Sequence, residues 1–529
     1  MANETTDVLI IGTGFGGSIP GYYLAAGGAK VIMLERGPRF STEDFTQSLR
    51  VGTFNRFIDS ISGKGIDVTA GNCVGGSSVT YYAASLRAPS FIFERRGTLG
   101  RRIWPKAITR SSLNHWYSRV EAAIPVAELS WNDVPYAGGL FAAACNRAGH
   151  TCQPVPLAVD LTKCTNCNWM HTGCVFDAKR SMLFNYIPGA ESFGAEIRPL
   201  HEVQKIQPAQ TAGYRYAVSY LEIDPNDYTQ SLGSGTIEAK IVIVAAGTMG
   251  TPVILQRSAL ALGGMPPAVG RYMSANGDRV SFAAFDEDKV SSLLGLQRSP
   301  GVAYEAFPIG KPINTMTFDY LDPKKPEFSR FALQQLYSPP IVNALPGVDQ
   351  SPFWFGIDKR GLLLNWRSWM AIVEMTEDAN EGVFGPPPKT GSFTRLGPGI
   401  ASGQLEYPIA PQTQHGFDLA DAAAESILTL DGLATFHTVA STNSIQCAHP
   451  LASCRMGDNP GTSALDDRHE LRGHPGIFVT DGASVPTSLC VNPSLTIAAL
   501  AERASSILLK RANQYGVTVK HSGTIPVPS

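Results

Sequence analysis

The chain of 529 residues is too long for one simple hydrophobic core, and at roughly 150 residues per domain it predicts two or three domains. The formal net charge of −2 gives no electrostatic basis for binding nucleic acid or an anionic membrane. No apolar run reaches the roughly 18 residues of a transmembrane helix, and no secretion signal opens the sequence. Together with an odd number of cysteines, nine, these features predict an intracellular, cytoplasmic protein.

The start of the chain predicts a site for an adenine dinucleotide. Residues 8–11 form a short apolar run, typical of a central parallel strand covered on both faces. A G-x-G-x-x-G turn follows, with its glycines at Gly12, Gly14 and Gly17. Glycines there permit a tight turn and a close approach of backbone to pyrophosphate. A second apolar strand, 30–34, ends at Glu35, which is placed to accept hydrogen bonds from a ribose diol. The alternative is a glycine-rich turn of some other α/β protein, with Glu35 as a surface charge.

Later segments extend this pattern. A second glycine-rich loop covers residues 71–78, an apolar strand at 241–246 ends at Gly247, and the segments 476–482 and 492–496 lie near the carboxyl end. In order and spacing they resemble the flavin-binding segments of the glucose-methanol-choline oxidoreductases, which implies FAD as the cofactor. The positions that match the family's flavin contacts are Gly12, Gly14, Gly17, Glu35, Gly75, Gly76, Ser77, Val203, Gly247, Asp481, Asn492 and Pro493.

The same resemblance indicates how FAD is held. Val203 is expected to meet the adenine through its backbone. The 71–78 loop contains no histidine, the residue that attaches the flavin in covalent members of the family. We therefore expect non-covalent, dissociable FAD.

A finer resemblance is to the cholesterol oxidases, in the segments 275–277, 447–451, 479–482 and 496–503. The His/Asn pair of that branch falls on His449 and Asn492. Flavin-dependent alcohol oxidation needs a group that takes the hydroxyl proton and one that holds the oxygen, and imidazole and amide suit these roles. The alternative for His449 is a core or surface histidine. Asn492 also fits a helix N-cap, with Pro493 at the first position of a helix over 493–510.

Other positions bear on the substrate. Glu305, in an apolar frame that would raise the pKa of its carboxyl, is the best match to the glutamate with which cholesterol oxidases abstract a proton and isomerise the steroid. An ordinary surface glutamate is the alternative. Tyr81 stands where that branch has an asparagine, and Ser494 replaces an aromatic residue. Both departures alter the volume of the pocket and the approach of oxygen.

A cysteine-rich run combines Cys164, Cys167 and Cys174 with His171. These are the ligand types of a zinc or iron-sulfur site, but a local disulfide and free thiols are equally open and we assign no metal. A similar run precedes an Ala-Lys-x-Ser element in fungal and plant long-chain alcohol oxidases, which residues 178–181 resemble.

We expect an α/β fold in which a Rossmann-like FAD-binding domain is interleaved with an α+β substrate-binding domain whose sheet roofs the flavin. The FAD-binding domain comprises 1–40, 64–110, 180–275 and 465–529, and the substrate-binding domain comprises 41–63, 111–179 and 276–464. The predicted function is oxidation of an alcohol group on an apolar, sterol-like molecule by hydride transfer to flavin N5, with oxygen or another electron acceptor. The alternatives are a long-chain or aryl alcohol oxidase or dehydrogenase of the same family, a non-catalytic flavin-binding protein, and an NAD-linked dehydrogenase.

Overall fold

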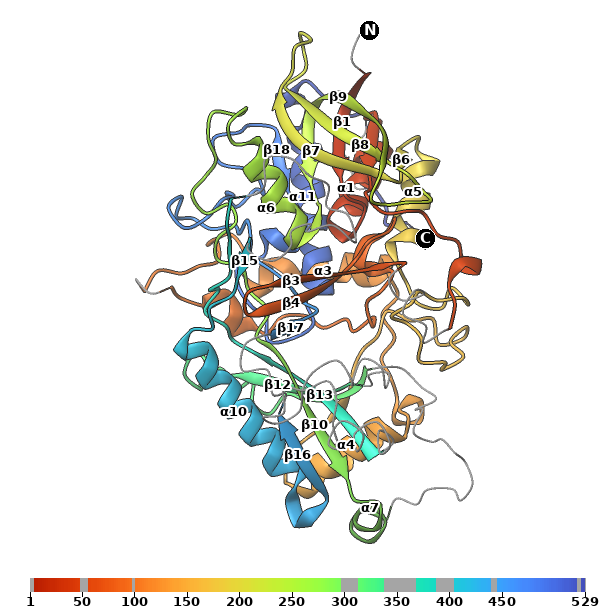
Figure 1. Cartoon of the computed structure of the whole chain (residues 1–529), viewed down its shortest axis with the longest axis vertical. Coiled ribbons are helices and arrows are strands. Elements are labelled where there is room, and N and C mark those ends of the chain that lie inside the picture. The colour runs from red at the N-terminus through yellow and green to blue at the C-terminus, as the bar shows by residue number, and fades with distance from the viewer. Residues whose placement is uncertain are drawn as a thin grey trace.

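In a computed structural model of the chain, two large sheets lie towards opposite ends of the long axis, with a small sheet between them (Figure 1). The small sheet consists of β17 (Ile445–Cys447), β4 (Ile66–Gly71) and β3 (Ile58–Gly63). The structure describes residues 4–47, 56–97, 100–295, 313–336, 368–386, 404–438, 445–520 and 525–528.

The first large sheet carries the parallel strands of a dinucleotide-binding fold. Its order is β6 (Glu196–Arg198), β2 (Val31–Leu34), β1 (Glu4–Ile11), β9 (Ser231–Val244), β8 (Tyr216–Ile223) and β7 (His201–Pro208), with β18 (Ile477–Val479) also paired to β9. The pairs made by β1, β2, β6 and β18 are parallel, and β7, β8 and β9 pair antiparallel. The apolar run predicted as a central strand is buried, as a strand covered on both faces requires.

Five helices accompany this sheet (Figure 1). They are α1 (Phe15–Ala26), α3 (Arg110–Ala123), α5 (Tyr186–Ser192), α6 (Gly247–Ser258) and α11 (Ser494–Arg511). Helix α1 contacts α5 and α11, α11 contacts α3, and α6 contacts β7. The first and last helices of the fold are therefore neighbours.

Two of these helices contain an internal proline, which has no N–H for the carbonyl one helical turn before it. In α1, the carbonyl that Pro20 leaves free accepts a hydrogen bond from the hydroxyl of Thr480, at 2.6 Å. In α6, the carbonyl that Pro252 leaves free accepts one from the hydroxyl of Ser453, at 2.7 Å. Residues from the last part of the chain thus complete both helices, because a buried carbonyl needs a donor.

The second large sheet is antiparallel throughout. Its order is β16 (Ala434–Thr438), β10 (Asp278–Phe285), β13 (Trp369–Thr376), β12 (Phe331–Leu336), β11 (Ile313–Thr317) and β5 (Gln153–Pro154). The helices α4 (Tyr136–Arg147) and α10 (Pro411–Leu428) pack on it through a core that includes Phe141, Leu333, Ile372 and Ala424. The short helix α7 (Glu287–Leu294) follows β10, and β14 (Val383–Phe384) pairs with β15 (Leu405–Glu406).

The predicted fold class is confirmed: a parallel-strand sheet of dinucleotide-binding type is joined to an antiparallel substrate-domain sheet. The division into segments stays a prediction. The strands of the two large sheets lie inside the segments assigned to their respective domains, whereas the boundary at 63/64 cuts the hairpin of β3 and β4. None of the helices in the described part of the chain has the length and apolar character that crossing a bilayer requires.

Candidate active site

His449 and Asn492 are brought together from two distant parts of the chain. His449 follows β17, and Asn492 lies just before α11. The amide nitrogen Nδ2 of Asn492 lies 3.3 Å from Nε2 of His449. Asn492 is buried, whereas the His449 side chain keeps 19% of its surface exposed. The two predicted catalytic side chains are therefore within hydrogen-bond reach, with the imidazole open on one side.

The antiparallel sheet supplies a partner to each member of this pair. Asp278, the first residue of β10, places Oδ1 2.9 Å from Nδ1 of His449. Gln334 of β12 exchanges two hydrogen bonds with Asn492: Nε2 of Gln334 donates to Oδ1 of Asn492 at 2.9 Å, and Nδ2 of Asn492 donates to Oε1 of Gln334 at 3.3 Å. Sequence reasoning missed both. The signal available for Gln334 was a polar residue inside the buried strand 331–336.

The predicted helix cap at Asn492 is wrong by one residue. Helix α11 begins at Ser494, Pro493 occupies the cap position, and no side chain caps the helix. Both atoms of the Asn492 amide are already engaged by Gln334 and His449. These long-range partners turn the amide towards Gln334 and His449 and so override the local Asn-Pro signal.

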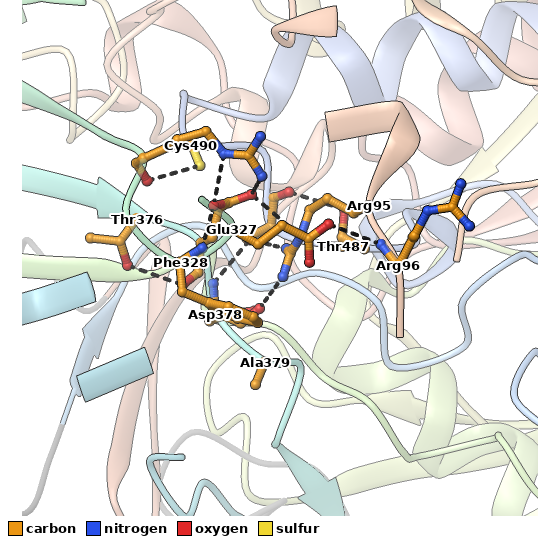
Figure 2. Close-up of polar contacts among 12 residues, drawn as sticks. Arg95, Arg96, Glu327, Phe328, Thr376, Asp378, Ala379, Thr487 and Cys490 are labelled. Carbon is orange, nitrogen blue, oxygen red and sulfur yellow. Dashed lines mark hydrogen bonds and ion pairs between the residues drawn. The ribbon is translucent and has the colours of Figure 1, made fainter. Parts of the chain in front are cut away.

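A buried charged network holds the segment before Asn492 (Figure 2). The Glu377 carboxylate accepts two hydrogen bonds from Arg330, at 2.6 and 3.1 Å, and lies 3.6 Å from Nε of Arg95. Arg95 also donates to the carbonyl of Asp378 at 2.7 Å, and the Cys490 thiol donates to the carbonyl of Arg330 at 3.7 Å. The end of β13 is thereby joined to the approach to α11, which restricts the position of Asn492.

The two glycine loops face each other across a cradle lined by backbone. At Gly12, where φ is +93°, an added Cβ would lie 2.3 Å from the carbonyl oxygen of Ala245. A Cβ at Gly76 would lie 2.9 Å from Cα of Gly14, and Gly75 has a φ of +96°. The loops can approach this closely only without side chains. Such a cradle fits a pyrophosphate, which binds to exposed backbone N–H groups.

Each glycine loop is also held in shape by contacts of its own. Gly17 is as crowded as Gly12, since its Cβ would lie 2.0 Å from the Gly12 carbonyl oxygen. The Ser77 hydroxyl accepts a hydrogen bond from the backbone N–H of Gly71 at 2.9 Å, which closes the second loop. These contacts hold each glycine loop in its turn.

Glu35 lies at the edge of this cradle and is buried. Its carboxylate accepts hydrogen bonds from the backbone N–H and hydroxyl of Thr13, at 2.9 and 2.7 Å, and from the backbone N–H of Gly37 at 3.1 Å. Burial raises the pKa of Glu35. The Thr13 hydroxyl in turn accepts from the backbone N–H of Gly75 at 3.0 Å, a link that sequence reasoning missed. Val203 lies on β7, where the backbone of His201 donates to the Glu35 carbonyl at 2.8 Å.

Asp481 connects the carboxyl end of the chain to the same region. Its carboxylate accepts hydrogen bonds from the backbone N–H of Gly247 at 2.8 Å, the hydroxyl of Thr251 at 2.6 Å and the backbone N–H of Ala483 at 3.0 Å. Burial raises its pKa to about 6. A Cβ at Gly16 would lie 2.7 Å from the Asp481 backbone. The predicted cofactor contacts from both ends of the chain thus gather at one place, and the cradle and its acids suit an adenine dinucleotide.

Tyr81 and Ser494, the departures from the cholesterol oxidase pattern, both contact this region. The Tyr81 ring packs edge-on against Phe15 of the first glycine loop, with ring centroids 5.6 Å apart, and its hydroxyl donates to the carbonyl of Arg180 at 2.7 Å. The Ser494 hydroxyl donates to the carbonyl of Ala84 at 2.9 Å. Glu305 lies outside the described residues, so its role stays a prediction.

The cysteine-rich run lines a small pocket together with Phe45, Trp169 and Phe176. Cys164, Cys167 and Cys174 form no disulfide with one another, and in the described part of the chain no three side chains of metal-binding type converge. Burial lowers the pKa of His171 to about 4, which keeps its imidazole neutral. The buried Lys179 donates to the carbonyls of Val79, Tyr81 and Met170, and so fastens this run to the end of the second glycine loop.

The sequence of the chain matches a known protein family. The family model described as GMC oxidoreductase matches the chain in two parts, residues 6–275 and residues 410–501. The chain belongs to the GMC oxidoreductase family. It is therefore an enzyme that oxidises CH–OH groups with FAD, and the family's cofactor agrees with the cradle described above. This finding sets aside the NAD-linked and non-catalytic alternatives.

Individual GMC relatives are distant. A cholesterol oxidase of Mycobacterium tuberculosis is 27% identical over 95% of this chain and 90% of its own length. A long-chain-alcohol oxidase of Arabidopsis thaliana is 22% identical over 94% of this chain and 67% of its own length. The crystal structure of pyridoxine 4-oxidase from Mesorbium loti superposes with a TM-score of 0.65 at 15% identity, covering 97% of this chain and 99% of that one. That likeness shows the shared fold.

Proposed function

We propose that this enzyme oxidises an alcohol group on an apolar, sterol-like molecule, with His449 and Asn492 as the catalytic residues. The observation that carries the proposal is their 3.3 Å contact, which leaves the imidazole partly exposed while Asn492 is buried. A partly exposed proton acceptor beside a fixed amide is what oxidation of a hydroxyl group requires.

In this reaction the carbinol C–H bond breaks with its electron pair, the O–H bond breaks with its proton passing to Nε2 of His449, and the carbonyl bond forms. When bound, FAD supplies the acceptor for the hydride. When the alcohol binds, its oxygen takes over the N–H that Asn492 otherwise directs at Nε2 of His449, while the second N–H stays on Gln334, so the amide holds the hydroxyl group beside the imidazole. Gln334 keeps the amide in place for that role.

The residues proposed to hold FAD are those of the cradle, together with Glu35, Val203, Gly247, Asp481, Asn492 and Pro493. Binding is non-covalent, since the loop at 71–78 has no histidine to attach the flavin. Acid precipitation of the holoenzyme should release the yellow flavin into the supernatant. Flavin that stayed with the precipitated polypeptide would contradict this mode of binding.

The sterol-like substrate is supported by the likeness to cholesterol oxidase over 95% of the chain, and Glu305 is the proposed additional base. A second candidate is a long aliphatic alcohol. It is favoured by the plant long-chain-alcohol oxidase among the relatives and by Tyr81, whose ring packs against the first glycine loop where cholesterol oxidases have a smaller residue.

An anaerobic flavin-reduction screen against 3-hydroxysteroids, fatty alcohols and aryl alcohols tests the proposal. Bleaching by a steroid supports the first candidate, and bleaching by fatty alcohols alone supports the second. His449→Gln should slow reduction by about 10²- to 10⁴-fold without loss of flavin, the range typical of a lost general base. Reduction of this variant at the wild-type rate would remove His449 from the mechanism. Readmission of oxygen or an artificial acceptor then identifies the oxidant.

A further inference from the structure

We propose that Asp278 is a positioning residue that holds His449 in the tautomer with its proton on Nδ1, leaving Nε2 free to accept the substrate proton. The proposal rests on the function assigned to His449 above. It adds a third residue, from the antiparallel sheet, to the His/Asn pair.

The first argument comes from the Asp278 side of the imidazole. Oδ2 of Asp278 accepts a hydrogen bond from the backbone N–H of Ala448 at 3.1 Å, and Oδ1 lies 2.9 Å from Nδ1 of His449. The side chain is 3% exposed, so these contacts replace water. An ionised carboxylate only accepts hydrogen bonds, and Nδ1 must therefore carry the proton.

The second argument comes from the opposite side of the ring. Nε2 of Gln334 donates to the thioether sulfur of Met316 at 3.5 Å, which fixes the orientation of the Gln334 amide. Oδ1 of Asn492 accepts from the same Nε2 at 2.9 Å, so the Asn492 NH₂ group faces Nε2 of His449. An amide NH₂ group only donates, and Nε2 must therefore be without a proton. Two independent hydrogen bonds thus select the same neutral tautomer.

A carboxylate is the side chain that meets both demands on Asp278. An asparagine has one accepting atom, so either the Ala448 N–H or the His449 Nδ1–H would lose its acceptor. With its oxygen on Ala448, the amide would donate to Nδ1 and drive the imidazole proton to Nε2, where it blocks proton uptake. The Asp278 carboxylate also lies where it stabilises the imidazolium once the proton has arrived.

The turn that carries Asp278 also holds the other catalytic residue. Asn276 accepts a hydrogen bond from the backbone N–H of Leu489 at 2.7 Å and donates to the carbonyl of Val491 at 3.2 Å. These contacts flank Cys490, which has a φ of +57°, in the segment that leads to Asn492. Residues 276–278 therefore set the position of both members of the pair.

The test compares the wild-type holoenzyme with Asp278→Asn by ¹⁵N NMR of selectively labelled histidine, with the His449 signals assigned through His449→Gln. We expect an unprotonated Nε2 in the wild type and a protonated Nε2 in the variant. Anaerobic flavin reduction should slow by about 10²-fold or more, with little change in KM. A purely structural role would lower the melting temperature and flavin content without moving the tautomer.

Asp421→Asn is the matched control. Asp421 of α10 pairs at 2.7 Å with Arg279, the residue next to Asp278 in β10, and serves neither catalytic side chain. This variant should keep the wild-type tautomer and rate.

A protonated Nε2 in the wild type overturns the proposal, even if Asp278→Asn fails to fold. An unchanged tautomer or rate in a folded Asp278→Asn variant overturns it as well. If no alcohol reduces the wild-type flavin, the proposed function fails, whereas the NMR comparison still decides the role of Asp278.

Discussion

On the parallel-sheet side of the site, Gly12 and Gly76 bring backbone against backbone, whereas on the antiparallel-sheet side Asp278 and Gln334 contribute buried polar side chains. The first side depends on the absence of side-chain atoms. The second depends on particular donors and acceptors in fixed places. Added bulk should therefore damage the cofactor side, and lost hydrogen-bonding capacity should damage the catalytic side.

The largest effect is expected from Gly12→Ala. The new Cβ meets the Ala245 carbonyl at 2.3 Å in a backbone with φ +93°, so we expect a loss of at least about 3 kcal/mol in unfolding free energy, together with loss of flavin. Urea unfolding and the flavin absorbance of the purified protein measure both.

Gly14→Ala tests whether an added methyl group can obstruct the cofactor site without disturbing folding. Gly14 has a φ of −68°, and its Cβ would meet nothing closer than Cα of Gly76, at 3.9 Å. The flavin-free variant should unfold like the wild type, while its affinity for FAD falls by about 10- to 100-fold. A Gly14→Ala protein with wild-type FAD affinity would show that the space between the loops is not the binding cradle.

A pH-dependent effect is expected from Asp481, the buried acid on the cofactor side. Its pKa is raised from 3.8 to about 6 on folding, so the folded state binds this proton more tightly than the unfolded state. The stability that this group contributes is present below about pH 4 and is lost as the pH rises to about 6, on the order of 3 kcal/mol. The difference in unfolding free energy between wild type and Asp481→Asn should therefore shift against the wild type across this interval. If the difference in unfolding free energy between the two proteins stays constant with pH, folding does not raise the pKa of Asp481.

A smaller effect is expected from Gln334→Leu on the catalytic side. Leucine leaves the Asn492 amide without its partner, so stability should fall by about 1 to 3 kcal/mol and flavin reduction should slow by at least about tenfold. Gln335→Leu is the control, because Gln335 is equally buried but accepts from Asn314, at 3.1 Å. The Gln335→Leu variant should lose a comparable amount of unfolding free energy and should reduce its flavin at the wild-type rate. Equal slowing in both variants would reduce the role of Gln334 to packing.

The smallest effect is expected on the cofactor side, where Thr480 from the later part of the chain is hydrogen-bonded to α1. Thr480→Val leaves the Gly16 carbonyl without a donor, since Pro20 has no N–H, and should cost about 1 kcal/mol. Pro20→Ala restores a donor within α1, so the same substitution should cost less in that background. A double-mutant cycle in urea measures this coupling, and strictly additive changes would show that the hydroxyl does not serve the helix.

The cofactor side can be predicted from sequence more fully than the catalytic side. The glycine turn, its strands and Glu35 are adjacent in the chain, and their chemistry follows from local backbone geometry. His449 and Asn492 were recognised because each lies within a short family-like segment. The partners Asp278 and Gln334 escaped because their roles arise from contacts across 171 and 158 residues of chain.

The error at the start of α11 has the same origin. Asn492-Pro493 is a sound local signal for a helix cap, but the amide is engaged by Gln334 of β12 in the antiparallel sheet. Thr13 was likewise hidden, since its hydroxyl joins Glu35 to Gly75 only once the two glycine loops meet. Tertiary hydrogen bonds, which no local pattern encodes, decided all of these positions.

The hydroxyl donors supplied to α1 and α6 have a consequence for biosynthesis. Ser453, Thr480, β18 and α11 are synthesised well after α1 and α6. A nascent chain that has reached residue 275 therefore holds β1, β2 and β9 but lacks the donors for two helix carbonyls and the strand that pairs with residues 242–244. The FAD-binding fold is therefore incomplete until these later segments have been made, and co-expression of the two halves as separate polypeptides should be needed to obtain coloured protein from a chain cut in the middle.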